Sequence, residues 1–423
     1  MSNNIRVDEA ANKLNRLRKM TLLSSIFKKN ILKKFNYLKF GYIHLIDENE
    51  FYEYGDKSDS MKVNIKILSP EFYVFLGSGG LLGVTEAYIA GYWRSDDIVT
   101  LIRLMIKNSK VMEQLDSGWV KLIRPLNNYI HRQRQNTLTG SKKNILAHYD
   151  LSNEFYKLWL DDTMTYSSGF FENSESTLKE ASIEKLDRIC RKLNLNKNDN
   201  ILEIGTGWGS FAIHAVKNYG CNITTTTISD AQYEYAKQKI LDEGLETKIT
   251  ILNQDYRKLE GKFDKVVSIE MIEAVGHEYV GLFFEKVSNL LKKDGLFALQ
   301  GITFNDLNFD KYKNSVDFIK KYIFPGSCLI SISQVTNAIK KTTDFEIVNL
   351  EDITKHYAKT LYEWRKKFMS VLPQVRALGF SSAFINMWEF YFIYCEAGFI
   401  ERNIGDYQFI FAKSDARDIQ IRY

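Results

Sequence analysis

The chain has 423 residues and a formal net charge of +5, with 45% hydrophobic and 13% aromatic residues. This composition supports a large buried core, which excludes an intrinsically disordered protein, and the length suggests roughly two or three domains. The four cysteines include no CxxC pair and no HExxH motif is present, so a disulfide scaffold, a structural zinc knot and a metal site are not expected.

Basic residues are concentrated at the N-terminus. Residues 1–40 contain ten Lys or Arg and two acidic residues, so this segment carries +8 and the remainder of the chain −3. Apolar residues recur among the lysines at broadly helical spacing between Asn12 and Tyr37. Such a segment suits an anionic membrane surface or nucleic acid. The alternative is an amphipathic helix that packs on its own domain and leaves its lysines solvated.

Residues 1–140 are predicted to form a small mixed α/β domain. Within them, Met61–Leu68 alternates as a strand does, Gly77–Gly83 is predicted to be a turn-rich loop, and Val84–Trp93 to be helical. The polar stretch His131–Asn144 is predicted to be an exposed linker. We expect no signal peptide and no transmembrane segment, since the most apolar stretch, Phe380–Ile400, is interrupted by two glutamates.

In residues 141–423 strands alternate with helices, which is the pattern of a doubly wound sheet. The predicted strands are Asn200–Ile204, Asn222–Ile228, Lys248–Leu252, Phe263–Ile269, Gly295–Thr303 and Asp406–Lys413. The predicted helices are Ser210–Tyr219, Ser229–Glu243 and Tyr279–Lys292. The expected fold class is therefore α/β, with a doubly wound sheet and a smaller N-terminal mixed α/β domain.

A glycine-rich loop stands between the first of these strands and a helix. Gly205, Gly207 and Gly209 let the backbone turn tightly and lie against a ligand. A dinucleotide site prefers GxGxxG with an acidic residue ending the second strand, whereas here the spacing is GxGxG and that strand ends in threonines. Asp255 is placed to meet an adenine amino group and Glu203 to face the amino-acid end of a ligand. The pattern favours S-adenosylmethionine over NAD, and a glycine turn without a ligand is the alternative.

Nine ordered motifs resemble those of the cyclopropane-fatty-acyl-phospholipid synthase family, whose members use S-adenosylmethionine to modify unsaturated acyl chains. They are His148–Ser152, Thr165–Ser168, Ile201–Gly209, Thr227–Gln232, Gln254–Arg257, Ser268–Gly276, Tyr322–Gly326, His356–Leu361 and Tyr394–Glu401. The resemblance runs from about His148 to the C-terminus, and the N-terminal region is similar to the extra domain of the phospholipid-acting members. It implies a class I methyltransferase, Rossmann-like fold.

The resemblance also implies the site residues. The cofactor contacts fall on Tyr149, Tyr166, Glu203, Gly205, Gly207, Gly209, Thr227, Gln232, Asp255 and Tyr256. The catalytic and bicarbonate-site positions fall on Glu273, Tyr357, Cys395, Gln300, Ile302 and Ser168. Members that bind bicarbonate often have Cys where Ser168 stands and His where Gln300 stands, and Gln can donate a hydrogen bond but cannot carry charge. Glu270 adds a carboxylate to this region, three residues before Glu273.

The family reaction starts when an alkene attacks the sulfonium methyl group and leaves a carbocation, after which a base removes a proton and a ring closes. The protein must position two reactants, exclude water and supply a base. We predict transfer of a methylene or methyl group from S-adenosylmethionine to unsaturated phospholipid acyl chains, giving cyclopropane fatty acids. Loss of a different proton would give methylene- or methyl-branched chains. A small-molecule methyltransferase and a non-enzymatic lipid- or nucleic-acid-binding protein are further alternatives.

The predicted cofactors are S-adenosylmethionine and, as in the members that bind it, bicarbonate. The predicted partners are unsaturated phospholipid acyl chains at an anionic membrane surface, and no nucleic acid. The expected location is cytoplasmic, peripheral to the inner face of the membrane. A homodimer is compatible with the sequence.

Overall fold

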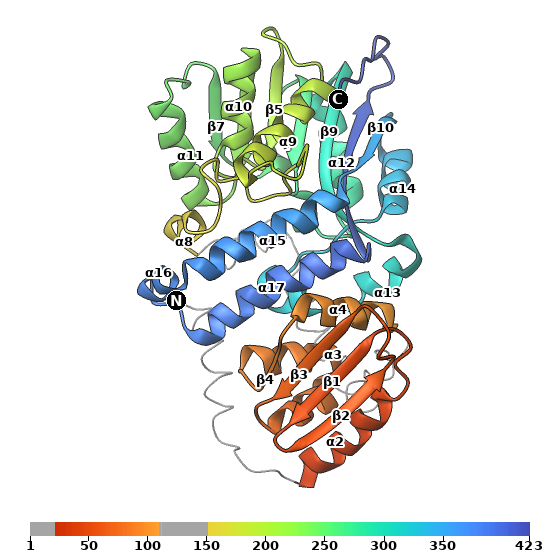
Figure 1. Cartoon of the computed structure of the whole chain (residues 1–423). Helices are drawn as coiled ribbons and strands as arrows, with labels where there is room; N and C mark the ends of the chain where they lie inside the picture. Colours follow the sequence, from red (N-terminus) through yellow and green to blue (C-terminus); the bar gives the residue numbers. More distant parts are fainter. Residues whose placement is uncertain (1–21, 110, 112–150) are drawn as a thin grey trace. The chain divides into compact units, whose positions relative to one another are not determined.

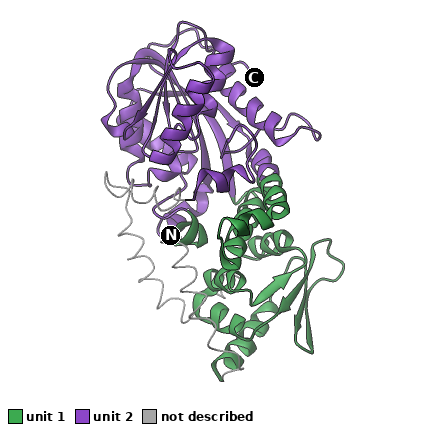
Figure 2. Ribbon diagram, turned by 90° about the vertical axis from the view of Figure 1, so that its left-hand side faces the viewer, with its two compact units in different colours: residues 1–133, 316–323, 361–403 green, residues 134–315, 324–360, 404–423 purple. Residues whose placement is uncertain are grey.

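The computed structural model describes residues 22–109, 111 and 151–423 and divides the chain into two compact units (Figures 1 and 2). Unit 1 comprises residues 1–133, 316–323 and 361–403, and unit 2 comprises residues 134–315, 324–360 and 404–423. Two segments from the last third of the chain, 316–323 and 361–403, therefore belong to unit 1. The predicted domain boundary at residue 140 would place both segments in the second domain. The predicted linker His131–Asn144 lies outside the described residues.

The described part of unit 1 contains a four-stranded sheet with the strand order β2-β1-β3-β4 (Figure 1). Its strands are β1 (Tyr42–Asp47), β2 (Glu50–Gly55), β3 (Lys62–Ile67) and β4 (Trp93–Ser95). β1 pairs antiparallel with β2 and parallel with β3. Every second residue of β1 and β3 is buried, as expected for a sheet with one face on a core. The strand predicted over Met61–Leu68 is confirmed.

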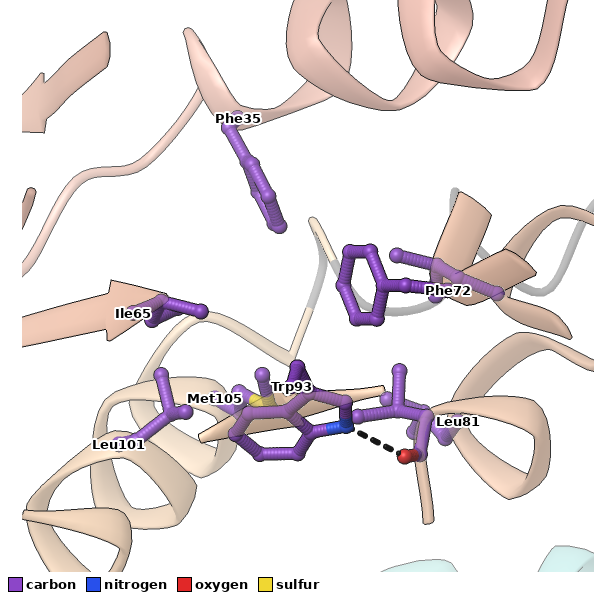
Figure 3. A pocket seen from close by; sticks show the side chains of 9 residues that line it. Phe35, Ile65, Phe72, Leu81, Trp93, Leu101 and Met105 are labelled. Atoms are coloured by element: carbon purple, nitrogen blue, oxygen red, sulfur yellow. Dashed lines mark hydrogen bonds between the residues drawn. The ribbon is translucent and has the colours of Figure 1, made fainter. Parts of the chain in front are cut away.

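The helices of unit 1 are α2 (Leu22–Phe35), α3 (Glu71–Ile89), α4 (Ile98–Lys107), α16 (Leu372–Ala377) and α17 (Ser382–Ile400), and α15 (Thr354–Ser370) enters from unit 2. Among them, α3 and α4 pack on this sheet, and α2 and α17 pack on these two helices. An apolar pocket lies among α2, β3, α3 and α4, where the indole N–H of Trp93 donates to the carbonyl oxygen of Val84 at 2.9 Å (Figure 3). This tryptophan is 1% exposed and anchors the core of the unit.

The loop predicted over Gly77–Gly83 is wrong, because this segment is helical. α3 runs through it as two helical stretches joined by a kink at Gly80, whose φ of 58° and ψ of −136° suit glycine only. The kink brings Gly83 against the chain, so that an added Cβ would lie 1.9 Å from the carbonyl oxygen of Phe75. The glycines therefore bend a helix and let it pack closely rather than end it.

Within the described ranges, α3 is also the helix that is long and apolar enough to cross a membrane by length and composition alone. Half of it is buried inside the structure. Its Tyr73 and Tyr88 are 0% and 1% exposed, and their hydroxyls donate to Asp47 at 2.7 Å and to Glu389 at 2.8 Å. Buried tyrosines with satisfied hydroxyls are typical of a core helix of a folded domain.

The described part of unit 2 contains a seven-stranded sheet with the order β10-β11-β9-β8-β5-β6-β7 (Figure 1). Its strands are β5 (Asn200–Ile204), β6 (Asn222–Thr227), β7 (Ile249–Asn253), β8 (Phe263–Ile269), β9 (Leu291–Phe304), β10 (Glu346–Asp352) and β11 (Ile404–Ala412). Neighbouring strands from β7 to β9 are parallel, and β11 pairs antiparallel with both β9 and β10. The predicted doubly wound α/β fold is confirmed, although β10 was not predicted.

Helices cover both faces of this sheet. They are α8 (Asn153–Lys157), α9 (Leu178–Lys192), α10 (Ser210–Tyr219), α11 (Asp230–Asp242), α12 (Val280–Leu290), α13 (Phe309–Lys313) and α14 (Ile332–Thr342). Ile201 of β5 belongs to one buried apolar cluster and its neighbour Leu202 to another, so successive side chains enter opposite cores. α11 begins as predicted, because the Ser229 side chain accepts a hydrogen bond from the N–H of Gln232.

The close approach in α3 gives a stability test. Gly83→Ala should lower the free energy of unfolding by about 3 kcal/mol, since a methyl group must displace the Phe75 carbonyl. The control is Gly79→Ala, where an added Cβ meets nothing within 4 Å. Urea denaturation followed by circular dichroism measures both variants. Equal stability of the two would contradict the described bend.

Candidate active site

The glycine loop joins β5 to α10 in a conformation that other residues rarely adopt. Gly205, Gly207 and Gly209 have φ angles of 102°, 53° and 87°. The N–H groups of Gly205 and Thr206 both donate to the carbonyl oxygen of Thr226 at 3.0 Å, which holds the loop on β6. A Cβ at Gly207 would meet no atom within 4 Å. The loop therefore leaves open space at its centre, as a ligand-binding loop must.

A chain of buried polar side chains lies beneath this loop. The hydroxyls of Thr206 and Thr225 are 2.7 Å apart, and Thr225 donates to the Glu203 carboxylate at 2.6 Å. Burial raises the pKa of Glu203 to about 8, although the Thr225 hydrogen bond and the charge of Lys185 oppose the shift. A cation that approaches a buried carboxyl group of this kind favours its ionised form. Glu203 thus fits the amino-acid end of S-adenosylmethionine.

Four further cofactor candidates lie at the end of β6 or follow β6 and β7. The Thr227 hydroxyl donates to the side-chain oxygen of Gln232 at 2.9 Å, and both residues are buried. Asp255 follows β7 as predicted, but Arg257 holds its carboxylate with Nη2 at 2.6 Å and Nε at 2.9 Å. Burial opposes ionisation of Asp255, and the contacts with Arg257 outweigh it and lower the pKa. The next residue, Tyr256, has its pKa raised to about 12 by burial.

Tyr166 belongs to an aromatic cluster that reaches the glycine loop. Its ring centroid lies 5.5 Å from those of Tyr156 and Trp159. Tyr156 in turn lies 4.9 Å from Trp208, which stands between the last two glycines of the loop and is 2% exposed. Trp208 was predicted only as part of the Ile201–Gly209 loop, with no role of its own. Tyr149 lies outside the described residues.

Glu270 is the centre of a second cluster, at the end of β8. Its carboxylate accepts hydrogen bonds from the backbone N–H of Ser168 at 2.8 Å, from Nε2 of Gln300 at 2.7 Å and from the hydroxyl of Tyr357 at 2.6 Å. The Glu270 N–H also donates to the Gln300 carbonyl at 2.8 Å. Its φ of 48° is uncommon for a residue with a side chain, and such strain concentrates at functional sites.

Glu273 lies beside Glu270 in the short helix η2 (Ile272–Ala274). Its Oε1 accepts a hydrogen bond from the N–H of Ile302 at 2.5 Å. Its Oε2 is buried and has no hydrogen-bond partner among the residues that the structure describes. Burial, and then the negative charge of Glu270, raise the pKa of Glu273 to about 8. The two carboxyl groups therefore form a site that can hold a proton near neutral pH.

The structure brings together five of the predicted catalytic and anion-site residues. They are Glu273, Tyr357, Gln300, Ile302 and Ser168. Ser168 contributes its backbone N–H, since its hydroxyl donates to the Gly169 carbonyl at 2.9 Å. Cys395 is a residue of unit 1, on α17, where burial raises the pKa of its thiol. Its role stays a prediction.

Two buried charged residues beside the Glu270 cluster were not predicted from the sequence. Lys185 of α9 is 0% exposed and donates to the Ser167 hydroxyl at 2.7 Å. Burial lowers its pKa to about 8, against the opposing charge of Glu270. Asp406 of β11 is also 0% exposed, and its Oδ2 accepts a hydrogen bond from Gln300 at 3.1 Å. Neither residue lies in a recognised motif. For Asp406 the sequence signal was a charge within the apolar strand β11, whereas α9 around Lys185 is rich in charged residues.

This chain is similar to known proteins over most of its length. The family model described as mycolic acid cyclopropane synthetase matches residues 136–409. Tuberculostearic acid methyltransferase UfaA1 of Mycobacterium tuberculosis is 33% identical over 340 residues, which is 79% of each chain. The cyclopropane-fatty-acyl-phospholipid synthase of Escherichia coli is 30% identical over 368 residues, 86% of this chain and 91% of that one.

A solved structure has the same fold. The mycolic acid cyclopropane synthase CmaA1, crystallised in complex with SAH and CTAB, is 31% identical, with a TM-score of 0.60 over 64% of this chain and 98% of its own. The class I methyltransferase fold expected from the resemblance is thereby confirmed. The chain belongs to the mycolic acid cyclopropane synthetase family and is an S-adenosylmethionine-dependent methyltransferase.

Proposed function

We propose that this enzyme transfers a one-carbon group from S-adenosylmethionine to the double bond of unsaturated phospholipid acyl chains, giving cyclopropane fatty acids. The observation that carries the proposal is the Glu270 carboxylate cluster beside the glycine loop. The loop follows β5 and Glu270 follows β8, and these two strands are parallel neighbours. Since ligands bind at the carboxyl edge of such sheets, a cofactor and a base meet there.

S-adenosylmethionine fits the residues around the loop. Gly207 leaves the space that a ligand needs, and Glu203 offers a buried carboxylate to its ammonium group. When bound, the cofactor supplies an electrophilic methyl group. The protein orients the alkene toward that methyl group and excludes water, which would otherwise capture the carbocation.

We assign the role of base to Glu270. Of the positions that the family resemblance gives to the bicarbonate site, Ser168 (through its N–H), Gln300 and Tyr357 donate to Glu270. The backbone N–H of Ile302, a further such position, donates to Glu273. A carboxylate of the chain thus takes the place of a free anion. Burial raises the pKa of Glu270, and this makes its carboxylate a stronger base than that of an exposed glutamate. Glu273, whose Oε2 has no hydrogen-bond partner within the described ranges, is a second proton acceptor in the same site.

A methylene- or methyl-branched chain is the second candidate product, favoured by the likeness to tuberculostearic acid methyltransferase UfaA1. Both products arise from the same carbocation and differ in which proton the base removes. Proton NMR of lipids from cells that produce the enzyme separates the two, because a cyclopropane methylene has its own resonances. An unchanged lipid profile in such cells would contradict the proposed function.

We also propose that α2 helps to hold the enzyme on an anionic membrane. Ser24, Ile31 and Phe35 are its buried residues. Its described exposed face combines apolar and basic side chains: Leu22, Leu23, Ile26, Lys29 and Lys33. Lys28 differs, since it pairs with Asp47 and Glu50 and its side chain is 12% exposed. A basic face with exposed apolar residues suits shallow insertion between lipid headgroups. A homodimer stays a prediction.

Cofactor binding is tested at the centre of the loop. Gly207→Val should weaken S-adenosylmethionine binding at least about tenfold, because the side chain fills the open space against the ligand. The matched control is Gly244→Val, which imposes similar strain at a φ of 65° where an added Cβ also meets nothing. Calorimetry measures both affinities. Unchanged affinity in folded Gly207→Val would refute the assignment of the loop.

The base is tested by removing and replacing the Glu270 carboxylate. Glu270→Gln should lower turnover by about 10²-fold or more, the scale for a positioned acid or base. Glu270→Gly should be equally impaired, but it leaves a space lined by three donors and relaxes the φ of 48°. Added bicarbonate should therefore restore activity to Glu270→Gly and not to Glu270→Gln.

Two further measurements complete this test. Glu273→Gln should lower turnover without responding to bicarbonate, because the Glu270 carboxylate still occupies the donors. Removal of dissolved carbonate should leave the wild-type rate unchanged. If carbonate removal slows the wild-type enzyme, a free anion is the base and the assignment to Glu270 is wrong.

Membrane docking is tested by charge removal on α2. Changing Lys29 and Lys33 to Gln should weaken binding to phosphatidylserine vesicles roughly 30-fold at low salt, since each lysine contributes about 1 kcal/mol near such a surface. The control changes Lys62 and Lys66, two exposed lysines of β3, to Gln. Vesicle sedimentation compares the variants, and equal binding by both would show that α2 has a structural role only.

A further inference from the structure

The carboxyl groups of Asp406 and Glu270 both accept hydrogen bonds from one side-chain amide group, that of Gln300. Nε2 of Gln300 donates to Glu270 Oε1 at 2.7 Å and to Asp406 Oδ2 at 3.1 Å. Asp406 lies on β11 opposite Ile302 of β9, and Gln408, two residues further on the same face, lies opposite Gln300. The antiparallel pairing of β9 and β11 therefore sets the second carboxyl group beside the first.

The orientation of the Gln300 amide follows from its other contacts. The Gln408 side-chain oxygen accepts a hydrogen bond from Nζ of Lys192 at 2.8 Å, and a lysine ammonium group can only donate. Gln408 must then present its NH2 group to the Gln300 oxygen, at 3.0 Å. Gln300 in turn can only direct its own NH2 group toward the two carboxyl groups. One amide group thus serves both acids.

A single proton on this pair best satisfies these contacts. Asp406 is 0% exposed and its Oδ1 finds no hydrogen-bond partner in the described part of the chain. Two ionised carboxylates around one donor, shielded from water, repel each other strongly. Glu270 receives hydrogen bonds from Ser168 and Tyr357 as well as Gln300, so the negative charge is better stabilised on Glu270 than on Asp406. The proton consequently belongs on Asp406.

The surrounding charges agree with this placement. Burial, then the charges of Glu270 and Glu273, and last a side-chain hydrogen bond with Glu270 raise the pKa of Asp406 well above its usual range, and Lys185 opposes the shift. Burial also raises the pKa of Glu270, and the Tyr357 hydrogen bond and the charge of Lys185 oppose it. Lys185 of α9 is the buried cation that opposes these shifts, and its single charge is too little to keep all of the carboxyl groups ionised.

We propose that Asp406 is a positioning residue that holds one proton and shares it with Glu270, so that Glu270 stays the anionic member of the pair and faces the substrate as its base. This inference rests on the assignment of Glu270 under the proposed function. Before the proton transfer, the pair holds one proton and one negative charge. The C–H bond of the added carbon breaks, its electron pair forms the new C–C bond, and the proton forms an O–H bond with Glu270. The pair then holds two protons and no charge, and one proton leaves to solvent before the next turnover.

The test uses two variants of the full chain. Asp406→Asn keeps the shape and a donor toward Glu270 but carries no carboxylic acid proton, whereas Asp406→Leu removes both. Infrared difference spectra at neutral pH should show a carboxylic acid C=O band in the wild type that Asp406→Asn lacks and that shifts in D2O. Subtracting the spectrum of Asp406→Asn from that of the wild type cancels the bands of Glu203 and Glu273, because both proteins retain these residues.

Kinetics give the second readout. Both substitutions should lower turnover, and the acid limb of the pH profile for kcat should move to higher pH by about one unit or more in Asp406→Leu, because Glu270 loses a donor that stabilises its anion. The shift should be smaller in Asp406→Asn, whose amide still donates. A residue that acted only through packing would lower turnover without moving this limb.

Each result decides the inference. An infrared band that survives in Asp406→Asn would overturn it, as would an acid limb in Asp406→Leu that coincides with that of the wild type. If Asp406→Leu does not fold, the infrared comparison decides alone. Failure of the base assignment is seen separately, as near-normal turnover of Glu270→Gln, because the infrared band reports the proton on Asp406 whether or not Glu270 reacts with substrate.

Discussion

The burial of the Glu270 carboxylate is the constraint on which the site depends. Placing a charge away from water costs several kcal/mol unless hydrogen bonds replace the lost hydration, so its donors must be held in position. Those donors come from Ser168 before α9, from Gln300 on β9 and from Tyr357 on α15. The antiparallel strand β11, which carries Asp406, must also be paired with β9. The carboxylate is therefore stable only when these separate segments have assembled.

The glycine loop after β5 and Glu270 after β8 form the two halves of the site, and their backbones have opposite requirements. After β5 the chain uses glycines at positive φ, because a ligand must lie against the backbone and side chains would exclude it. After β8 the chain adopts a positive φ at a glutamate, because there a side chain itself must fill the space among the donors. Backbone strain is present at both strand ends, and in each case it serves to control what occupies the edge of the sheet.

The sequence predicted the parallel strands and the glycine loop well, since both depend on local patterns. The loop predicted over Gly77–Gly83 was wrong. Glycines often end helices, but in this segment they allow α3 to continue with a bend at Gly80. The strand β10 was not predicted, because its residues are partly exposed and show little alternation between buried and exposed positions. Asp406 could not be assigned a role either, since its contact with Gln300 follows from the register of β9 and β11, which no local pattern contains. The family motifs supplied the site residues but not the partner of Glu270.

A base that belongs to the chain differs from a free anion in what must happen after the reaction. A tethered carboxylate is always in place, so its positioning requires no loss of translational freedom at each turnover. A free bicarbonate can carry the abstracted proton away when it leaves, whereas Glu270 must pass its proton to another group. Buried neighbours that exchange protons near neutral pH are then necessary, and Lys185 and Glu273, with pKa values of about 8, have that property. The concentration of ionisable groups around Glu270 is thus what a tethered base requires.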